Sequence, residues 1–256
     1  MTAESLFVPA AKGAWLPTDD ARGPWTPEAL HGGPTAALLA RAIEPLLDPL
    51  LPVRLTIELL RPVPVAPLVV DAELIRPGKK VRLAGARLLH DGTIVATATA
   101  LAIRTEAVAV PEQPTPPMPP LPAEGTTLVP NALGYDAFHS HGVEHRFVTG
   151  SFTEAGPATD WIRLRVPVVP NELPSGLQRV AAAADFGNGI SRVSSLEALT
   201  FINPDLTIYL ERAPVGEWIC LDAVSRLHAH GIGLAESALY DETGRLGRSV
   251  QSLLVS

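Results

Sequence analysis

Apolar residues recur at the spacing of an α-helix in two stretches of the chain. Over residues 32–47, Leu38, Ala42 and Ile43 fall on one face, and the stretch opens with two glycines and a proline, which suits a first helical turn. Over residues 174–189, a run of four alanines is followed by an aspartate and by glycines that suit a helix end. We therefore expect one helix in each half of the chain.

The stretches that follow each helix alternate apolar and polar residues or form short β-branched runs. Such patterns are typical of strands in an antiparallel sheet. After the first helix we expect strands over 53–61, 67–76, 80–90 and 93–105. After the second we expect strands over 196–202, 206–213, 217–227, 232–241 and 245–256. Two further strands, 144–152 and 159–169, are expected before the second helix.

A proline-rich segment separates the two halves. Seven of the twelve residues 111–122 are prolines, which excludes a helix or a central strand there. The segment could be a ligand for a partner domain, but patterned sequence on both sides favours a stiff linker. We divide the chain into an N-terminal domain (1–108), a linker (109–142) and a C-terminal domain (143–256).

The two halves also share a sequence repeat. LTIELLRP (55–62) and LTIYLERA (206–213) agree at five positions, and the last hairpin turn of each half, at Gly92 and Gly244, comes at nearly the same offset. Two copies of a helix followed by an antiparallel sheet predict an α+β fold in which each sheet wraps one helix. The alanines allow helix and sheet to approach closely.

Four segments, taken in order, resemble double-hotdog acyl-CoA thioesterases of the thioesterase II (TesB-like) type. They are LHGGPTAALLARAIE (30–44), LTIELLRPVPV (55–65), DLTIYLERAPVGEWICLDAVS (205–225) and YDETGRLGRSVQSLL (240–254). The similarity extends over nearly the whole chain and is weakest at the linker and around 134–170. It implies a double hotdog fold and the hydrolysis of acyl-CoA to free acid and CoA.

The resemblance also implies a reaction centre in the second copy. In that family an Asp on the helix, a Thr or Ser on a strand and a Gln near the C-terminus hold the attacking water. Carried over by motif, these positions are Asp185, Asn203 and Gln251. Asn203 departs from the family pattern. Its amide can still donate and accept hydrogen bonds, but the departure could mean reduced activity, or Thr200 or Thr207 could take the role.

In the first copy, the positions that match Gln251 and Asn203 are about Thr99 and Pro52. Because proline has no side-chain donor or acceptor, we expect the first copy to lack a reaction centre and the chain to hold one site.

The turn His31-Gly32-Gly33 opens the first helix. It could contact the substrate or be a plain helix entry, and we include these three residues as substrate-binding candidates. Backbone N–H groups near a helix start are natural donors to an oxyanion, but the sequence does not tell which helix supplies them.

Two groups of histidines could in principle bind a metal. No acidic partner pattern of known spacing accompanies them, so we expect solvated loop ends, with no metal and no cofactor. These histidines are His139, His141, His145, His228 and His230. The single cysteine, Cys220, is expected to be a buried strand residue.

The composition of the chain restricts the kinds of partner that we expect. The chain has 256 residues with 46% hydrophobic and 18% charged residues, enough apolar sequence for a large core. Its net charge of −7 argues against nucleic acid as a partner. The sequence shows neither a signal-peptide pattern nor a membrane span, so we expect a cytoplasmic protein without membrane contact.

Other functions stay open on these observations. A non-catalytic acyl-CoA-binding protein is the main alternative, favoured if Asn203 disables the centre. An enoyl-CoA hydratase of hotdog fold is weaker, because the Asp/His pattern of such enzymes is not found. The carrier could be CoA or acyl carrier protein, and a homodimer of double hotdogs is plausible by analogy.

Overall fold

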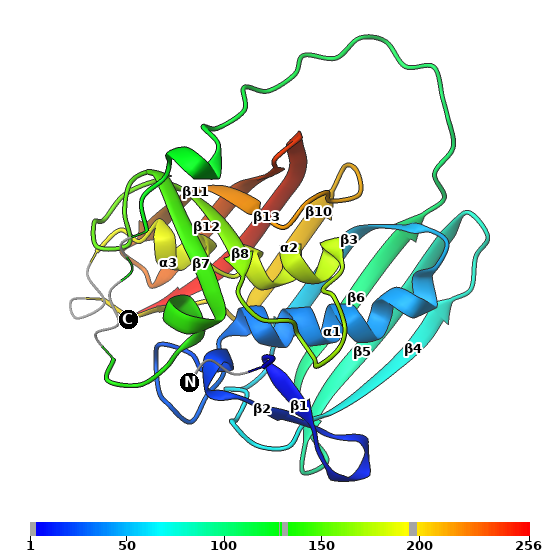
Figure 1. Cartoon of the computed structure of the whole chain (residues 1–256), viewed down its shortest axis with the longest axis vertical. Helices are drawn as coiled ribbons and strands as arrows, with labels where there is room; N and C mark the ends of the chain where they lie inside the picture. The colour runs from blue at the N-terminus through cyan, green and yellow to red at the C-terminus, as the bar shows by residue number, and fades with distance from the viewer. Residues whose placement is uncertain (1–3, 128, 130–132, 195–198) are drawn as a thin grey trace.

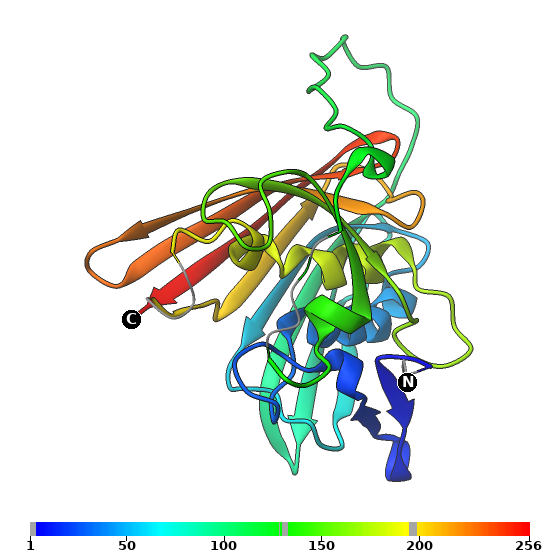
Figure 2. The ribbon, with the colours of Figure 1, turned by 60° about the vertical axis from the view of Figure 1, so that its left-hand side comes forward.

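The computed structural model describes residues 4–127, 129, 133–194 and 199–256. Its centre is a pair of helices, α1 (Gly32–Leu47) and α2 (Gly176–Ala184), which lie antiparallel on one face of a large sheet (Figure 1). A short helix, α3 (Gly187–Ile190), follows α2 directly. The sheet curves around the helix pair, as Figure 2 shows from the side.

The strands of the two copies form one continuous antiparallel sheet, in which the strand order of the second copy mirrors that of the first. The order is β4-β5-β6-β3-β10-β13-β12-β11, and β8 and β7 continue it beyond β11. The first copy supplies β3 (Leu51–Leu59), β4 (Val69–Arg76), β5 (Val81–His90) and β6 (Thr93–Ile103). The second copy supplies β7 (Val143–Thr149), β8 (Ala158–Leu164), β9 (Phe201–Ile202), β10 (Asp205–Leu210), β11 (Ile219–His228), β12 (Ile232–Asp241) and β13 (Gly244–Val255).

The repeated motif pairs with itself at the centre of this sheet. Thr56 of β3 lies opposite Thr207 of β10, and their Oγ1 atoms are 3.3 Å apart. On one side of this pair Leu55 lies opposite Ile208, and on the other side Ile57 lies opposite Leu206. Leu55 and Leu206 are equivalent positions of the repeat, as are Ile57 and Ile208. The two copies are therefore related by a pseudo-twofold axis through this threonine pair, which confirms the predicted duplication and the double hotdog architecture.

Small residues bring the two helices together, as the alanine content predicts. Ala182 and Ala183 are almost completely buried. A side-chain carbon added at Gly33 would lie 2.4 Å from the carbonyl oxygen of Ala182, so only glycine allows this approach of α1 to α2. The predicted burial of Cys220 in β11 is also confirmed.

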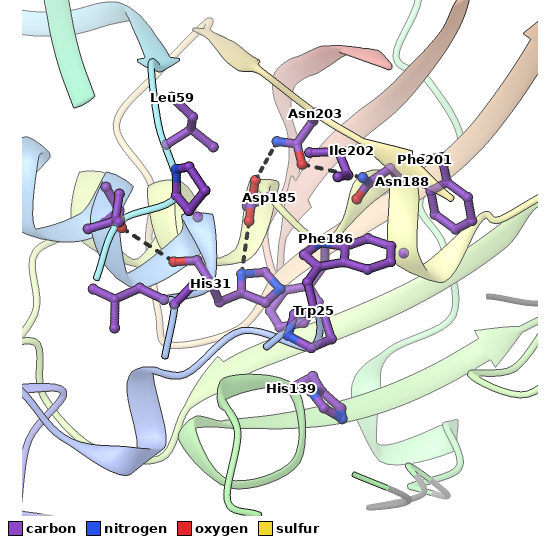
Figure 3. A pocket seen from close by; sticks show the side chains of 18 of the residues that line it. Trp25, His31, Leu59, His139, Asp185, Phe186, Asn188, Phe201, Ile202 and Asn203 are labelled. Atoms are coloured by element: carbon purple, nitrogen blue, oxygen red, sulfur yellow. Dashed lines mark hydrogen bonds and ion pairs between the residues drawn. The ribbon is translucent and has the colours of Figure 1, made fainter. Parts of the chain in front are cut away.

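The second helix is shorter than predicted. Instead of one helix over 174–189, α2 ends at Ala184, Asp185 is its C-cap residue, and α3 begins at Gly187. The break turns the Asp185 side chain toward the start of α1 (Figure 3). The predicted strand over 196–202 lies partly outside the described residues, and its described end is β9.

Two segments outside the repeat also have defined places. A hairpin of β1 (Phe7–Pro9) and β2 (Trp15–Pro17), which the sequence did not predict, bridges to Leu68 just before β4. The chain between β6 and a short 3-10 helix, η3 (Pro122–Glu124), arches away from the body as the long loop in Figure 1. It returns where the Trp161 indole donates to the Pro120 carbonyl at 2.7 Å.

No helix in the described ranges is long and apolar enough to cross a membrane.

Candidate active site

A cavity of about 730 Å³ opens where the N-terminus of α1 meets the C-terminus of α2. Both copies and the end of the linker contribute to its wall. Most of the wall is apolar, including Trp25, Leu30, Leu59, Val63, Phe186, Phe201 and Ile202. Its polar residues are Thr26, His31, Thr35, Arg61, His139, Thr153, Asp185, Asn188, Arg192 and Asn203.

The Asp185 side chain has three polar partners. The Asn203 side-chain amide donates to Oδ1 at 2.8 Å, and the Gln251 amide donates to the same oxygen at 3.3 Å. Oδ2 lies 2.8 Å from Nδ1 of His31. The side chain is only 5% exposed, and Figure 3 shows it between His31 of the first copy and Asn203 of the second.

Two contacts meet at Nδ1 of His31. The Gly33 N–H donates to this nitrogen at 3.1 Å, so His31 is the N-cap residue of α1. Oδ2 of Asp185 lies 2.8 Å from the same nitrogen, a distance that requires a proton between the two atoms. His31 thus connects the start of α1 to Asp185.

The three residues carried over from the family do come together, in unequal positions. Asp185 and Asn203 line the cavity, whereas Gln251 is fully buried behind them. Gln251 also accepts the Asn188 N–H at 3.1 Å and donates to the Asp185 carbonyl at 3.3 Å. It thus fixes the end of α2 and the start of α3 around Asp185.

The start of α1 is adapted to this carboxylate. A side-chain carbon at Gly32 would lie 2.6 Å from Oδ2 of Asp185, so any other residue there would displace the acid. Gly32 lines the cavity, whereas Gly33 lies outside its wall, against α2. The His31 ring packs against Phe138 and Phe186, with ring centres 5.2 and 4.6 Å away, which fixes its orientation.

Neither alternative hydroxyl reaches the centre. Thr207 is bonded to Thr56 in the middle of the sheet, and Thr200 pairs through its backbone with Ser256. Neither threonine is part of the cavity wall. Of the three residues considered for the family's hydroxyl position, Asn203 is the one that touches Asp185.

The strand register corrects one repeat position. Thr56 pairs with Thr99, whereas its equivalent Thr207 pairs with Val250. The first-copy counterpart of Gln251 is therefore Ala100 and not Thr99, because counting from the hairpin turns ignores the bulges in these strands. Pro52 remains the counterpart of Asn203.

The prediction that the histidines are solvated loop ends is wrong for two of them. His139 is buried in the cavity wall, and burial, with a smaller contribution from His31, lowers its pKa to about 4. His145 is buried with its Nδ1 2.5 Å from Asp160, a carboxyl whose pKa is raised by burial. His145 alternates with buried Val143 and Phe147 along β7, a pattern that indicates an inward side chain.

The other histidines are less buried. His141 is half-buried, and His228 and His230 are exposed, as predicted. Among the described residues no group of His, Cys, Asp and Glu has the arrangement of a metal site.

Fold and cavity together define a double hotdog with a carboxylate at the junction of its two helices. A family model of the acyl-CoA thioesterase N-terminal domain matches residues 21–103, and one of the C-terminal domain matches residues 110–255. The chain therefore belongs to the acyl-CoA thioesterase family, as its resemblance indicated. No curated protein sequence gives a significant match.

Solved structures share the fold over most or all of the chain. A hot dog protein of unknown function from Alicyclobacillus acidocaldarius is 21% identical, with a TM-score of 0.72 over 95% of this chain and 92% of that one. A protein of Thermobifida fusca YX, named provisionally as a thioesterase II, is 19% identical, with a TM-score of 0.75 over 100% and 98%. An acyl-CoA thioesterase II from Mycobacterium marinum is 18% identical, with a TM-score of 0.64 over 89% and 90%.

Proposed function

We propose that this protein hydrolyses acyl-CoA thioesters to the free acid and CoA, with a water molecule activated by Asp185 and held in place with the help of Asn203 and Gln251. The observation that carries the proposal is the Asp185 carboxyl group, which is buried at the end of a mainly apolar cavity and contacted by three side chains from both copies.

The surroundings of Asp185 suit thioester hydrolysis. The reaction needs a group that takes a proton from water and donors where oxyanion charge develops. Gly32 brings the first turn of α1 to the cavity wall, and the N–H groups of a first helical turn have no partner within the helix. The start of α1 is therefore the helix end that we propose for oxyanion stabilisation, with His31 and Gly32 against the substrate.

The cavity also suits an acyl thioester. Its wall is mainly apolar and would cover an acyl chain. Arg61 and Arg192 also line it, and Arg61 is exposed. Two cations on a chain with net charge −7 suit a phosphorylated carrier, a feature that CoA and the prosthetic group of acyl carrier protein share.

A non-catalytic acyl-CoA-binding protein is the second candidate. It is favoured by the hydrogen bonds of Asn203, whose amide nitrogen already donates to Asp185 and, at 3.3 Å, to the Asp205 carbonyl. A side chain engaged in this way has less capacity to hold a water. Homodimer formation and a cytoplasmic location remain predictions from the sequence.

The test is the release of free thiol from acyl-CoAs of graded chain length, measured for the native protein and for Asp185→Asn. We expect turnover by the native protein and a loss of at least about 100-fold in the variant, the lower range for general acid–base groups. Turnover that persists undiminished in Asp185→Asn would contradict the role of Asp185. Binding without any turnover would favour the second candidate.

A further inference from the structure

We propose that the cavity holds a second polar site, formed by His139 and Arg192 beside Phe152, which binds a carboxylate at the far end of the acyl chain. The preferred substrates are then acyl thioesters that carry a second carboxyl group. This inference rests on the proposed function, because it takes an acyl thioester as the ligand of the cavity, and it names the class of acyl group.

Three segments of the chain come together at this second site. His139 belongs to a short π-helix, η4 (Phe138–Gly142), Phe152 lies between β7 and β8, and Arg192 follows α3. The rings of His139 and Phe152 stack with their centres 5.5 Å apart, and Nη1 of Arg192 donates to the Phe152 carbonyl. All three residues line the cavity. They form one continuous part of its wall, which we call the distal site.

The distal site is set apart from Asp185. The polar partners found for Asp185 in the described ranges do not include His139 or Arg192. Figure 3 shows His139 well away from Asp185, with Phe186 and Trp25 between them in this view. Both of these rings line the cavity. An acyl chain whose thioester lies at Asp185 can therefore cross an apolar part of the wall before its end meets the distal site.

The polar atoms of the distal site lack partners of their own. His139 is only 5% exposed, and neither of its ring nitrogens has a hydrogen-bond partner among the described residues. Its Nδ1 is sealed within the protein, whereas Nε2 is not. Arg192 has a sealed and unpaired Nε, and its Nη2 has no partner in the part of the chain that the structure describes. Because buried polar groups are normally hydrogen-bonded, Nε2 and Nη2 are available to a polar group of the ligand.

The charge of Arg192 favours an anion as that group. Burial lowers the Arg192 pKa, and no acidic neighbour among the described residues opposes this effect. A buried cation without a counter-ion is unfavourable, and a planar guanidinium matches the two oxygens of a carboxylate. Burial also lowers the pKa of His139 to about 4, so its ring is neutral near pH 7, and Nε2 can pair with an oxygen of the same group.

The two arginines of the cavity wall differ in their surroundings. Arg61 is exposed and suits the phosphates of a carrier, which stay in contact with water. Arg192 is half-buried against Phe152 and His139, so its anion must enter a mainly apolar wall. A carboxylate on the acyl chain enters the cavity with that chain, which is why we assign it to Arg192.

The test compares two acyl-CoA series of graded length, one ending in a methyl group and one in a carboxylate. At the best-fitting length we expect kcat/KM for thiol release to be about ten- to 100-fold higher for the carboxylate series, as hydrogen bonds to a charged group provide. Uncleavable thioether analogues of both series, bound in a calorimeter, give the same comparison without turnover.

Two variants then locate the preference. Arg192→Gln removes the charge and keeps an amide that can donate to the Phe152 carbonyl, and we expect it to abolish the preference. His139→Phe keeps a ring against Phe152 and should reduce the preference about two- to tenfold. Its thermal melting should not fall, because the lost Nδ1 is unpaired in the native protein. Arg226→Gln, at an exposed arginine paired with Glu236 outside the cavity wall, is the control and should keep the native preference.

The outcomes separate this inference from the proposed function. Hydrolysis of the methyl series as fast as the carboxylate series at every length would overturn the distal site and keep the proposed function. An Arg192→Gln variant that weakens both series equally would place Arg192 against the carrier and also overturn the distal site. Tighter binding of the carboxylate thioethers, lost in Arg192→Gln, without thiol release from either series would support the distal site and overturn the proposed function.

Discussion

The two ends of the helix pair occupy equivalent positions in the duplicated fold, but different side chains surround them. At one end, the start of α1 faces Asp185 beside the cavity. At the other end, the start of α2 faces Glu44, which accepts from the Ser175 hydroxyl at 2.6 Å and from the Gln178 amide at 3.2 Å. Both ends place a carboxylate against a helix N-terminus, but Glu44 does not line the cavity.

The difference follows from the lengths of the helices. Beginning from their N-caps, Arg41 holds in α1 the position that Asp185 holds in α2, and it forms a surface ion pair with Glu172. Helix α2 stops there, level with the start of α1, whereas α1 continues to Leu47, which is completely buried. Beyond Arg41, α1 adds the buried Ile43 and Leu47, whereas beyond Asp185 the chain breaks and continues as α3 beside the cavity.

The largest expected effect comes from the paired glycines at the helix starts. In Gly32→Ala the added carbon collides with the Asp185 carboxylate, so we expect at least about a 100-fold loss of thiol release, as expected for an ångström-scale misplacement. In Gly176→Ala the added carbon meets Pro214 at 3.0 Å, so we expect a stability cost of about 1 kcal/mol with a native rate. Equal rates in the two variants would show that the ends do not differ in function.

A smaller effect is expected at Asn203. Asn203→Ala removes the 2.8 Å bond to Asp185, a bond to a charged group worth about 1.5–3 kcal/mol. We expect thiol release to fall about ten- to 100-fold. The matched control is Pro52→Ala at the equivalent position of the first copy, which should leave the rate unchanged. An unchanged rate in Asn203→Ala would remove Asn203 from the centre.

At the Glu44 end of the helix pair, Glu44→Gln should change the stability of the protein without changing the rate of thiol release. Burial is the main cause that raises the Glu44 pKa above 4.5, and the bonds from Ser175 and Gln178 oppose it. The folded state therefore binds this proton more tightly than the unfolded state. The contribution of Glu44 to the free energy of unfolding is therefore largest at low pH, and it is lost as the pH rises from about 4.5 through the folded pKa.

Glutamine can keep both hydrogen bonds without a charge. We therefore expect native and Glu44→Gln proteins to melt alike below about pH 4 and the variant to be more stable near pH 7, by less than about 1.5 kcal/mol. Thermal melts across this range measure the difference. A variant that is less stable at pH 7 would mean that the Glu44 charge stabilises this end.

The smallest effect is expected at Arg41, the counterpart of Asp185. Its ion pair with Glu172 is partly exposed, and its guanidinium lies 5.0 Å from the Trp15 ring centre. We expect Arg41→Ala to cost about 0.5–1 kcal/mol and to leave thiol release unchanged. A loss of thiol release in Arg41→Ala would mean that this end of the helix pair affects the reaction at Asp185.

The sequence predicted the repeated architecture well because each strand and helix carries its own local pattern. The self-pairing of the repeated motif at Thr56 and Thr207 then determined how the copies join. Asp185, Asn203 and Gln251 were also predicted as a group, from the family resemblance, although only the structure shows that Gln251 supports Asp185 from behind.

Contacts between the copies could not be predicted in this way. His31 and Asp185 belong to different copies and meet because the helices pack antiparallel, a tertiary arrangement without a local pattern. No Asp/His pattern was therefore visible along the chain. The burial of His139 depends on the linker end, where the Tyr135 hydroxyl donates to the Gly23 carbonyl and Phe138 N–H to that of Arg22.

The most direct test of a single working end is the binding stoichiometry of an uncleavable acyl-CoA thioether, measured by calorimetry. We predict one molecule bound per native chain, no binding heat in Gly32→Ala, and an unchanged stoichiometry in Gly176→Ala. Two molecules per chain, or binding that survives in Gly32→Ala and is lost in Gly176→Ala, would contradict the placement of the site at Asp185.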